Sequence, residues 1–451
     1  MSSQSIPQQA PAPPLPRLGE ITETVTNTIF GKAPLWWLIA FGISSALAGA
    51  FVLVLGAVAL FGTGLWGINV PIVWGMGITN LVFWIGIGHA GTFISAFLLL
   101  MRQSWRNAFS RYAEAMTLFA LATAGMFPLF HVGRPEWIFY FAPYPNTMIL
   151  NPQWLSPLVW DAIAISTYGG ISAIFWFLDL IPDIAAMRDK AKRPIPRAFY
   201  GFLALGWRSD SNHWERLHKT AYILAALATP LVISVHSVVG LDFAIGNLPG
   251  WHHSIFPPYF VAGAIFSGLA MTVIVGIVLR SGYEGLKDFI TMDHIDKALK
   301  LMLITGLLVT YGYMAETFGG WYKADAFELP LIIERAIGPY APFYLAMLFF
   351  NCILIQLLWF KPVRKNIALI LVICVGILIG MWLERFVIVS VSLSYTYLAP
   401  TWEVFNFTFW DILTIFGPFG FFFAQFLVFI RFLPSLPISE TQQHAVEVAH
   451  A

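Results

Sequence analysis

Ten long apolar runs, separated by short polar connections, divide most of the chain. A helix needs about 20 apolar residues to cross the hydrocarbon core of a bilayer, and each run is long enough. Prolines and glycines interrupt several runs, which neighbouring helices in a membrane tolerate. The pattern therefore predicts an all-α polytopic membrane protein with ten transmembrane helices, at about 35–62, 72–101, 109–132, 155–181, 219–244, 257–281, 298–319, 339–360, 366–391 and 406–431.

The composition supports this class. The chain has 451 residues, of which 58% are hydrophobic and 11% are charged, whereas soluble domains carry about 25% charged residues. The net charge is +1 and no basic or acidic block is present, which argues against a nucleic-acid partner. Cys352 and Cys374 lie inside apolar runs, which indicates core packing rather than a disulfide framework or a metal cluster.

The distribution of cations predicts the direction of the chain in the membrane. Of the 25 lysines and arginines, 21 fall on one side of the predicted helices. The opposite side has three, Arg134, Lys323 and Arg335, and Arg385 lies inside a run. Cytoplasmic connections are the ones rich in lysine and arginine. Both termini are therefore predicted to be cytoplasmic, as an even number of helices requires.

The two ends of the chain differ from the middle. Residues 1–34 are polar and proline-rich, without the pattern of a secretory signal, and are expected to form a loose cytoplasmic tail. Residues 35–431 are expected to form one membrane domain, and residues 432–451 a second cytoplasmic tail. The outward connections, such as "GNLPGWHHSIFPP", are rich in aromatic residues. They are interpreted as an interfacial aromatic belt or as a surface on which another subunit docks.

Three titratable residues are predicted to lie at a similar depth, near the outer surface. His131 ends the third run, Asp161 lies about two turns inside the fourth, and Asp242 ends the fifth. Ionisable residues in a span are costly and usually functional or paired. A histidine and two carboxylates suit a quinol, because such groups accept the protons that leave as it is oxidised. The alternative is that they are interfacial residues or caps. Gly133 and Pro135 predict a helix stop that fixes the position of the His131 ring.

Three more charged residues are candidate neighbours of this site. Arg134 is a candidate for partner docking or for a carboxylate contact. Glu384 and Arg385, in "MWLERFVIV", are adjacent, and adjacent residues do not face each other on a helix. Arg385 is therefore expected to pair with Glu316 or Asp411 from another helix. Contact of Glu384 and Arg385 with a quinone head group is the alternative.

A further set of ionisable residues lies deeper in the predicted spans. His89 lies in "FWIGIGHAGTFIS", whose small residues permit close helix packing, with His236 toward the outside and Asp179 toward the cytoplasm. Three interpretations remain open. The three residues form a proton-transfer route, the two histidines hold a haem b between them, or His89 is a hydrogen-bonded core residue.

Several long motifs resemble a known family. They are "GITNLVFWIGIGHAGTFISAFLLL", "MFPLFHVGRPEW", "SPLVWDAIAISTYG", "HSVVGLDFA", "FPPYFVAGAIFSG" and "MWLERFVIV". They are similar to the NrfD/polysulfide-reductase-type membrane subunits that interact with quinol, and most similar to those of bacterial alternative complex III. The resemblance covers about residues 35–431. It implies two four-helix bundles flanked by single helices, in a multi-pass subunit of the bacterial inner membrane.

The resemblance also implies a function. His131, Asp161 and Asp242 match the family's quinol site near the periplasmic face, and His89 and Asp179 match its proton route. Quinol, such as menaquinol, is then the substrate, with no haem or iron–sulfur cluster in this chain. Electrons are expected to pass to a periplasmic iron–sulfur subunit and then to multihaem cytochrome c subunits. A homologous membrane subunit, a terminal oxidase and membrane lipids are the other expected partners.

Other functions remain open. The chain has no CxxCH haem attachment, cysteine cluster, phosphate loop or dinucleotide fingerprint, so electrons from quinol would need a separate redox partner. The same fold could serve as the quinone-reducing membrane anchor of a molybdoenzyme-type reductase or dehydrogenase. A proton-coupled secondary transporter is a third interpretation, although transporters place their sites near the midplane. A structural scaffold is a fourth.

Overall fold

The computed structural model describes residues 18–141 and 157–442, so residues 1–17 and 443–451 of the expected tails and the loop residues 142–156 lie outside the described residues. The described ranges form helices and loops, without β-strands. They include ten helices long and apolar enough to cross a membrane, which confirms the predicted class and helix number. These are built on α2 (Leu35–Phe61), α3 (Gly75–Thr92), α5 (Ser110–His131), α6 (Pro157–Lys190), α8 (Ser211–Ala244), α9 (Phe256–Gly282), α10 (Met292–Lys323), α12 (Ala341–Leu348), α14 (Ile367–Phe386) and α16 (Phe409–Phe432).

Some of these helices extend beyond the apolar runs that predicted them. The helix α8 begins at Ser211, eight residues before its apolar run, where Asp210 accepts a hydrogen bond from the backbone N–H of His213. Its first turns carry an ion pair between Lys219 and Glu215, one turn apart on the helix surface. The apolar pattern therefore marks the hydrocarbon-length part of each helix, while polar caps and pairs determine where the helix ends.

Three spans contain a wider π turn. The turns are Phe93–Phe97 after α3, Phe349–Ile353 after α12 and Val387–Val391 after α14. Short π turns are frequent at functional sites. The first begins four residues after His89 and the third two residues after Arg385, so two of the three lie close to ionisable residues that the sequence analysis selected.

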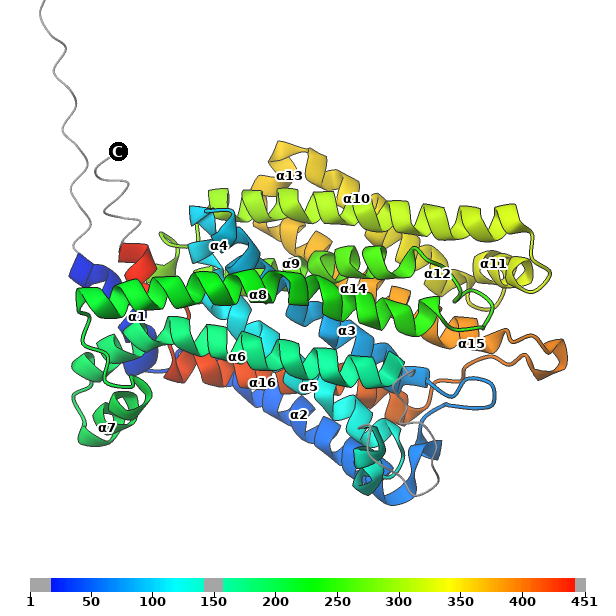
Figure 1. Ribbon diagram of the computed structural model, residues 1–451, viewed down its shortest axis with the longest axis horizontal. Helices are drawn as coiled ribbons and strands as arrows, with labels where there is room; N and C mark the ends of the chain where they lie inside the picture. Colours follow the sequence, from blue (N-terminus) through cyan, green and yellow to red (C-terminus); the bar gives the residue numbers. More distant parts are fainter. Residues whose placement is uncertain (1–17, 142–156, 443–451) are drawn as a thin grey trace, which may run out of the picture.

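The long helices run side by side along the molecule (Figure 1). The flanking helices α2 and α16 pack against each other, and α3 packs against α5 and α9. In the first half α6 packs against α8, and in the second half α9 packs against α10 and α14. This arrangement places α3 in the interior, where nearly all of its residues are buried.

The described parts of both expected tails are folded, not loose. Residues Leu18–Phe30 form the helix α1, with Ile21, Val25 and Ile29 buried. These three residues recur every four positions, which is the spacing of one helix face. At the other terminus, Leu436 is 1% exposed, so the chain after α16 is packed. Sequence analysis missed both because the tails are too polar to register as membrane spans.

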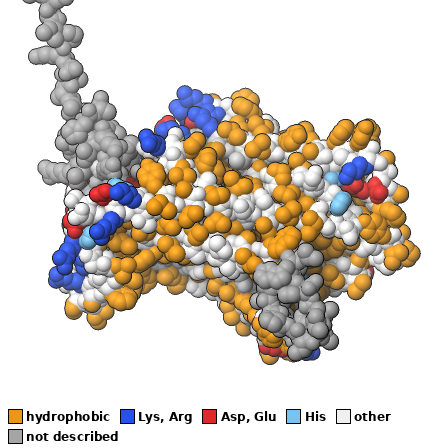
Figure 2. Space-filling view, viewed as in Figure 1, with side chains coloured by type: hydrophobic (Ala, Val, Ile, Leu, Met, Phe, Trp, Pro, Cys, Tyr) orange, Lys and Arg blue, Asp and Glu red, His pale blue; other side chains and the backbone are white. Residues whose placement is uncertain are grey.

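Short helices complete the described structure. They are α4 (Leu98–Leu100), α7 (Pro194–Leu203), α11 (Glu328–Ile337), α13 (Lys361–Lys365) and α15 (Ser392–Ser394). Lysine and arginine side chains gather at the end that carries α1, α7 and the described chain termini, while hydrophobic side chains cover much of the middle (Figure 2). We call this end the cation-rich end.

Close packing of α3 makes a stability prediction. A methyl group at Gly91 would collide with the backbone oxygen of Ala113 and the hydroxyl of Thr117 on α5. Such overpacking costs about 1–3 kcal/mol, so Gly91→Ala is expected to lower the thermal midpoint of the detergent-purified protein by several degrees. Gly125→Ala on α5, where nothing lies within 4 Å of the new methyl group, is the control and should not lower it. Equal midpoints for both variants would contradict this packing.

Candidate functional site

Two of the predicted site residues meet at the end of the bundle opposite the cation-rich end. Asp161 lies in the second turn of α6 and Asp242 near the end of α8, and the two carboxyl groups share a hydrogen bond. Because an ionised carboxylate has no proton to donate, this bond requires a proton on one of them. In each residue Oδ1 is buried without a hydrogen-bond partner in the described structure. The two carboxyl groups are therefore placed to share one proton, and each keeps a free acceptor atom.

His131 lies apart from this pair, against a different helix. It is the last residue of α5 and is half-buried. Its Nδ1 lies 3.1 Å from the point where a Cβ on Gly77 of α3 would stand. Gly133 follows with a φ of 76°, so the predicted helix stop is confirmed. Among the described contacts, no hydrogen bond joins His131 to Asp161 or Asp242, and Arg134 beyond it is exposed.

His89 and His236 form a buried pair in the interior. His89 comes from α3 and His236 from α8, and their ring centroids are 4.2 Å apart at an angle of 62°. Both side chains are fully buried. The Nδ1 of His89 is bonded to the backbone oxygen of Ile85 at 2.9 Å, while neither ring nitrogen of His236 has a hydrogen-bond partner in the described structure. The two rings are therefore in direct contact with each other.

Hydroxyl groups surround His89 on the side of α6. The ring of Tyr168 lies 5.4 Å from the ring of His89. The Tyr168 hydroxyl donates to the backbone oxygen of Gly88 at 3.0 Å and to Thr92 Oγ1 at 2.9 Å. The Thr92 hydroxyl is in turn 3.1 Å from Ser172 Oγ. These contacts form a short polar chain between α3 and α6.

Polar residues follow one face of α6 through its length. Tyr168, Ser172, Asp179 and Asp183 lie 7, 11, 18 and 22 positions after Asp161, and each interval is close to a whole number of helical turns. At about 1.5 Å per residue the face spans roughly 33 Å, which matches a hydrocarbon core of about 30 Å. We call these five residues the α6 polar face. Its spacing is visible in the sequence, although Asp183 was not among the predicted site residues.

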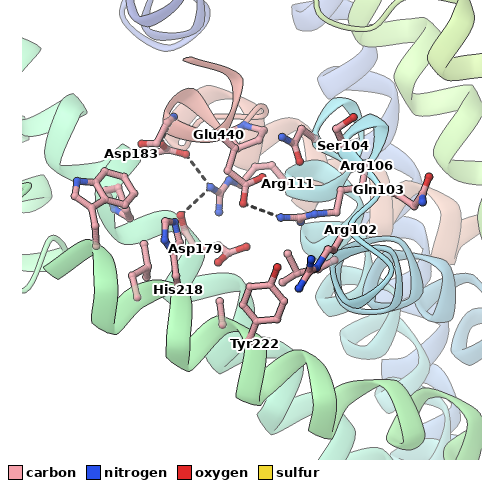
Figure 3. A pocket seen from close by; sticks show the side chains of 18 residues that line it. Arg102, Gln103, Ser104, Arg106, Arg111, Asp179, Asp183, His218, Tyr222 and Glu440 are labelled. Carbon is pink, nitrogen blue, oxygen red and sulfur yellow. Dashed lines mark hydrogen bonds and ion pairs between the residues drawn. The ribbon is translucent and has the colours of Figure 1, made fainter. Parts of the chain in front are cut away.

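The α6 polar face ends at a charged cavity of about 340 Å³ at the cation-rich end (Figure 3). Arg111 donates to the backbone oxygen of Asp179 at 2.7 Å and to Asp183 Oδ2 at 2.8 Å. Arg106 pairs with Glu440 at 2.9 Å. Sequence analysis missed Asp183 and Glu440, because their partners come from distant parts of the chain.

The prediction that Arg385 pairs with Glu316 or Asp411 is wrong. Arg385 pairs with its neighbour Glu384, which also accepts a hydrogen bond from Tyr313. The guanidinium lies 4.4 Å from the centroid of the Phe260 ring. Each member of the pair thus has one further contact from a neighbouring helix, Tyr313 of α10 at Glu384 and Phe260 of α9 at Arg385.

The two residues expected to pair with Arg385 have other partners. Glu316 pairs with Arg335 at 2.8 Å. Asp411 caps its own helix, where its Oδ2 accepts hydrogen bonds from the backbone N–H of Thr408 at 2.9 Å and from that of Gly67 at 2.8 Å. None of the described contacts joins the Glu384–Arg385 pair to Asp161 or Asp242.

The connection between α8 and α9 is held by protein contacts. Trp251 is buried, and its Nε1 donates to the backbone oxygen of Ile388 at 2.7 Å, so this tryptophan belongs to the core rather than to an aromatic belt. His253 pairs with Glu328 of α11. The hydrogen bond from His253 is the main reason that the pKa of Glu328 lies below its ordinary value. The connection therefore forms an ordered surface at the end of the bundle opposite the cation-rich end.

The comparisons with known proteins agree with this architecture. The family model described as "Polysulphide reductase, NrfD" matches residues 65–395. A protein of Halobacterium salinarum (strain ATCC 700922 / JCM 11081 / NRC-1), which is named as a dimethyl sulfoxide reductase membrane subunit, is 28% identical over 207 residues. The alignment covers 46% of this chain and 43% of that relative, so it spans less than half of either protein.

The buried pair of Glu384 and Arg385 makes a stability prediction. Removing one partner of a buried ion pair costs about 3–5 kcal/mol, because the other charge is left uncompensated. Arg385→Met is therefore expected to lower the thermal midpoint strongly, and the double variant Glu384→Gln/Arg385→Met less than the single one. Lys219→Met, which breaks an exposed pair, should change stability by about 1 kcal/mol at most. A wild-type midpoint for Arg385→Met would contradict a structural role.

Proposed function

The chain belongs to the NrfD polysulphide reductase family, and we propose that it is the ActC-type membrane subunit of a bacterial alternative complex III. In this proposal it binds and oxidises quinol at the end of the bundle opposite the cation-rich end, which faces the periplasm. The observation that carries the proposal is the hydrogen-bonded carboxyl pair of Asp161 and Asp242, on two helices that are packed together. His131 ends the adjacent helix α5.

The chemistry needs two proton acceptors. Oxidation of a quinol to a quinone releases two protons and two electrons. One hydroxyl proton passes to a free Oδ1 of the Asp161–Asp242 pair, and the second passes to Nε2 of His131, since its Nδ1 faces Gly77. General acid–base groups of this kind contribute about 10²–10⁴ in rate. No described contact joins Arg134, Glu384 or Arg385 to the pair.

The electrons must leave the chain. Its two cysteines lie in different helical segments and no CxxCH sequence is present. We therefore propose that an iron–sulfur subunit on the periplasmic side accepts the electrons and passes them to multihaem cytochrome c subunits. The ordered connection between α8 and α9 lies at the same end of the bundle and provides a surface for such a partner.

The same site supports a proton route through the first half of the molecule. The α6 polar face runs from the Asp161–Asp242 pair to the cavity at the cation-rich end, and the His89–His236 pair lies beside its middle. Two turns of α6 separate Ser172 from Asp179, so transfer across that interval requires water. We propose that quinol oxidation drives proton translocation along this route, with His89, His236 and Asp179 as transfer groups.

A second candidate function follows from one comparison. The relative of Halobacterium salinarum carries the name of a dimethyl sulfoxide reductase membrane subunit. On that basis the chain would exchange electrons between quinone and a molybdoenzyme-type partner, through the same carboxyl pair. The two candidates share the site and differ in the partner.

Variants of the site test quinol oxidation. In the assembled complex, Asp161→Asn and His131→Ala are each expected to reduce quinol oxidation about 100-fold or more, because each removes a proton acceptor. The measurement is steady-state turnover with a soluble electron acceptor, at equal amounts of assembled complex. Asp325→Asn, at an exposed position of the same end, is the matched control and should keep wild-type rates. Wild-type turnover in Asp161→Asn or His131→Ala would overturn the assignment.

Affinity purification separates the two candidate functions. A tagged chain, extracted in mild detergent from its own membrane, is expected to bring down multihaem cytochrome c subunits with an iron–sulfur subunit. The absorbance of reduced haem c and the peptide composition of the sample report the result. Recovery of a molybdopterin-containing partner without cytochrome would instead support the second candidate.

A further inference from the structure

The chain after α16 folds back onto the cation-rich end. We call residues 433–442 the C-terminal segment. Its residues Ser435, Leu436 and Ile438 are buried, and both the backbone N–H and the hydroxyl of Ser439 donate to Asp183 Oδ1, at 3.4 and 3.3 Å. The segment is therefore held on the final residue of the α6 polar face.

The segment also supplies a carboxylate to the cavity (Figure 3). Oε1 of Glu440 pairs with the buried Arg106, and the Glu440 side chain is 30% exposed. Its Oε2 is buried and has no hydrogen-bond partner in the described structure. Glu440 therefore has one oxygen held in place and one free acceptor atom, in a side chain that still reaches water.

Two carboxyl groups near the cavity lie outside its ion pairs. Arg106 is paired with Glu440 and Arg111 with Asp183. The carboxyl groups of Asp179 and Glu114 lie outside these two ion pairs. Glu114 is 3% exposed, with both oxygens unpartnered in the described structure. Arg102 and His218 also line the cavity, but Arg106 and Arg111 are already paired, so the unpaired carboxyl groups of Asp179 and Glu114 are the groups to which a proton can bind.

We propose that the C-terminal segment forms the entrance to the proton route at the cation-rich end, with Glu440 as the carboxylate that exchanges protons between water and Asp179. A proton binds Oε2 of Glu440, crosses the cavity through water to Asp179, and leaves Glu440 ionised and again paired with Arg106. The role of Ser439 is to hold the segment against Asp183. This inference rests on the proposed function, because quinol oxidation supplies the energy for uptake.

The test measures proton uptake and electron transfer separately. The assembled complex is placed in proteoliposomes that contain a trapped pH dye, and an impermeant electron acceptor outside selects one orientation. Quinol oxidation and the alkalinisation of the interior are recorded together. Wild-type complex is expected to take up protons from the interior. In Glu440→Gln the uptake per electron should fall at least fivefold, while turnover in the presence of a protonophore stays within twofold of wild type.

Two variants separate proton exchange from a structural role. Glu440→Asp keeps a titratable carboxylate and should restore most of the uptake. Glu215→Gln, at an exposed position of the same end, should match wild type. Wild-type uptake per electron in Glu440→Gln would overturn the inference. So would parallel losses of turnover and uptake in that variant, or a wild-type complex without uptake. Retained turnover in Asp161→Asn would overturn the quinol site instead, so the two failures are distinguishable.

Discussion

Close approach of α3 to its neighbours is the constraint on which the rest of the structure depends. Lipid tails are as apolar as the helix surfaces, so association of membrane helices relies on tight packing through small residues. Gly91 packs against the backbone oxygen of Ala113 on α5, and the methyl group of Ala90 packs against Gly268 of α9. This packing buries α3 and brings His89 into contact with His236 and near Tyr168. The polar interior of the first half exists because these helices are close.

The buried ionisable groups of the membrane helices are of two kinds, which differ in whether they are fully paired. Burying a charge is costly unless it is paired and hydrogen-bonded. Glu384 and Arg385 satisfy each other, and their role is structural in the described contacts. Asp161 and Asp242 instead share a hydrogen bond and keep unpartnered oxygens. Groups of the second kind bind or release a proton at little structural cost, which is why the proposed function rests on them.

The proposed site and the proposed entrance lie at opposite ends of α6. One helix therefore links the place where quinol would release protons to the place where others would enter. Electrons follow a different course, out of the chain to a partner. In the proposed function, this separation places the proton chemistry on the side chains of this chain and the electron transfer on partner subunits.

The sequence by itself determined the class, the ten membrane helices and the identity of the candidate residues, because these depend on local apolar length and on the cost of isolated charges in a span. The whole-turn spacing of the α6 polar face is present in the sequence, although the sequence analysis did not identify it. Only the tertiary structure decided which charges meet: Asp161 with Asp242, Arg385 with its neighbour, and Glu440 with Arg106. Partners from distant segments are brought together by the way side chains pack in three dimensions. The hydropathy pattern along the chain does not determine that packing.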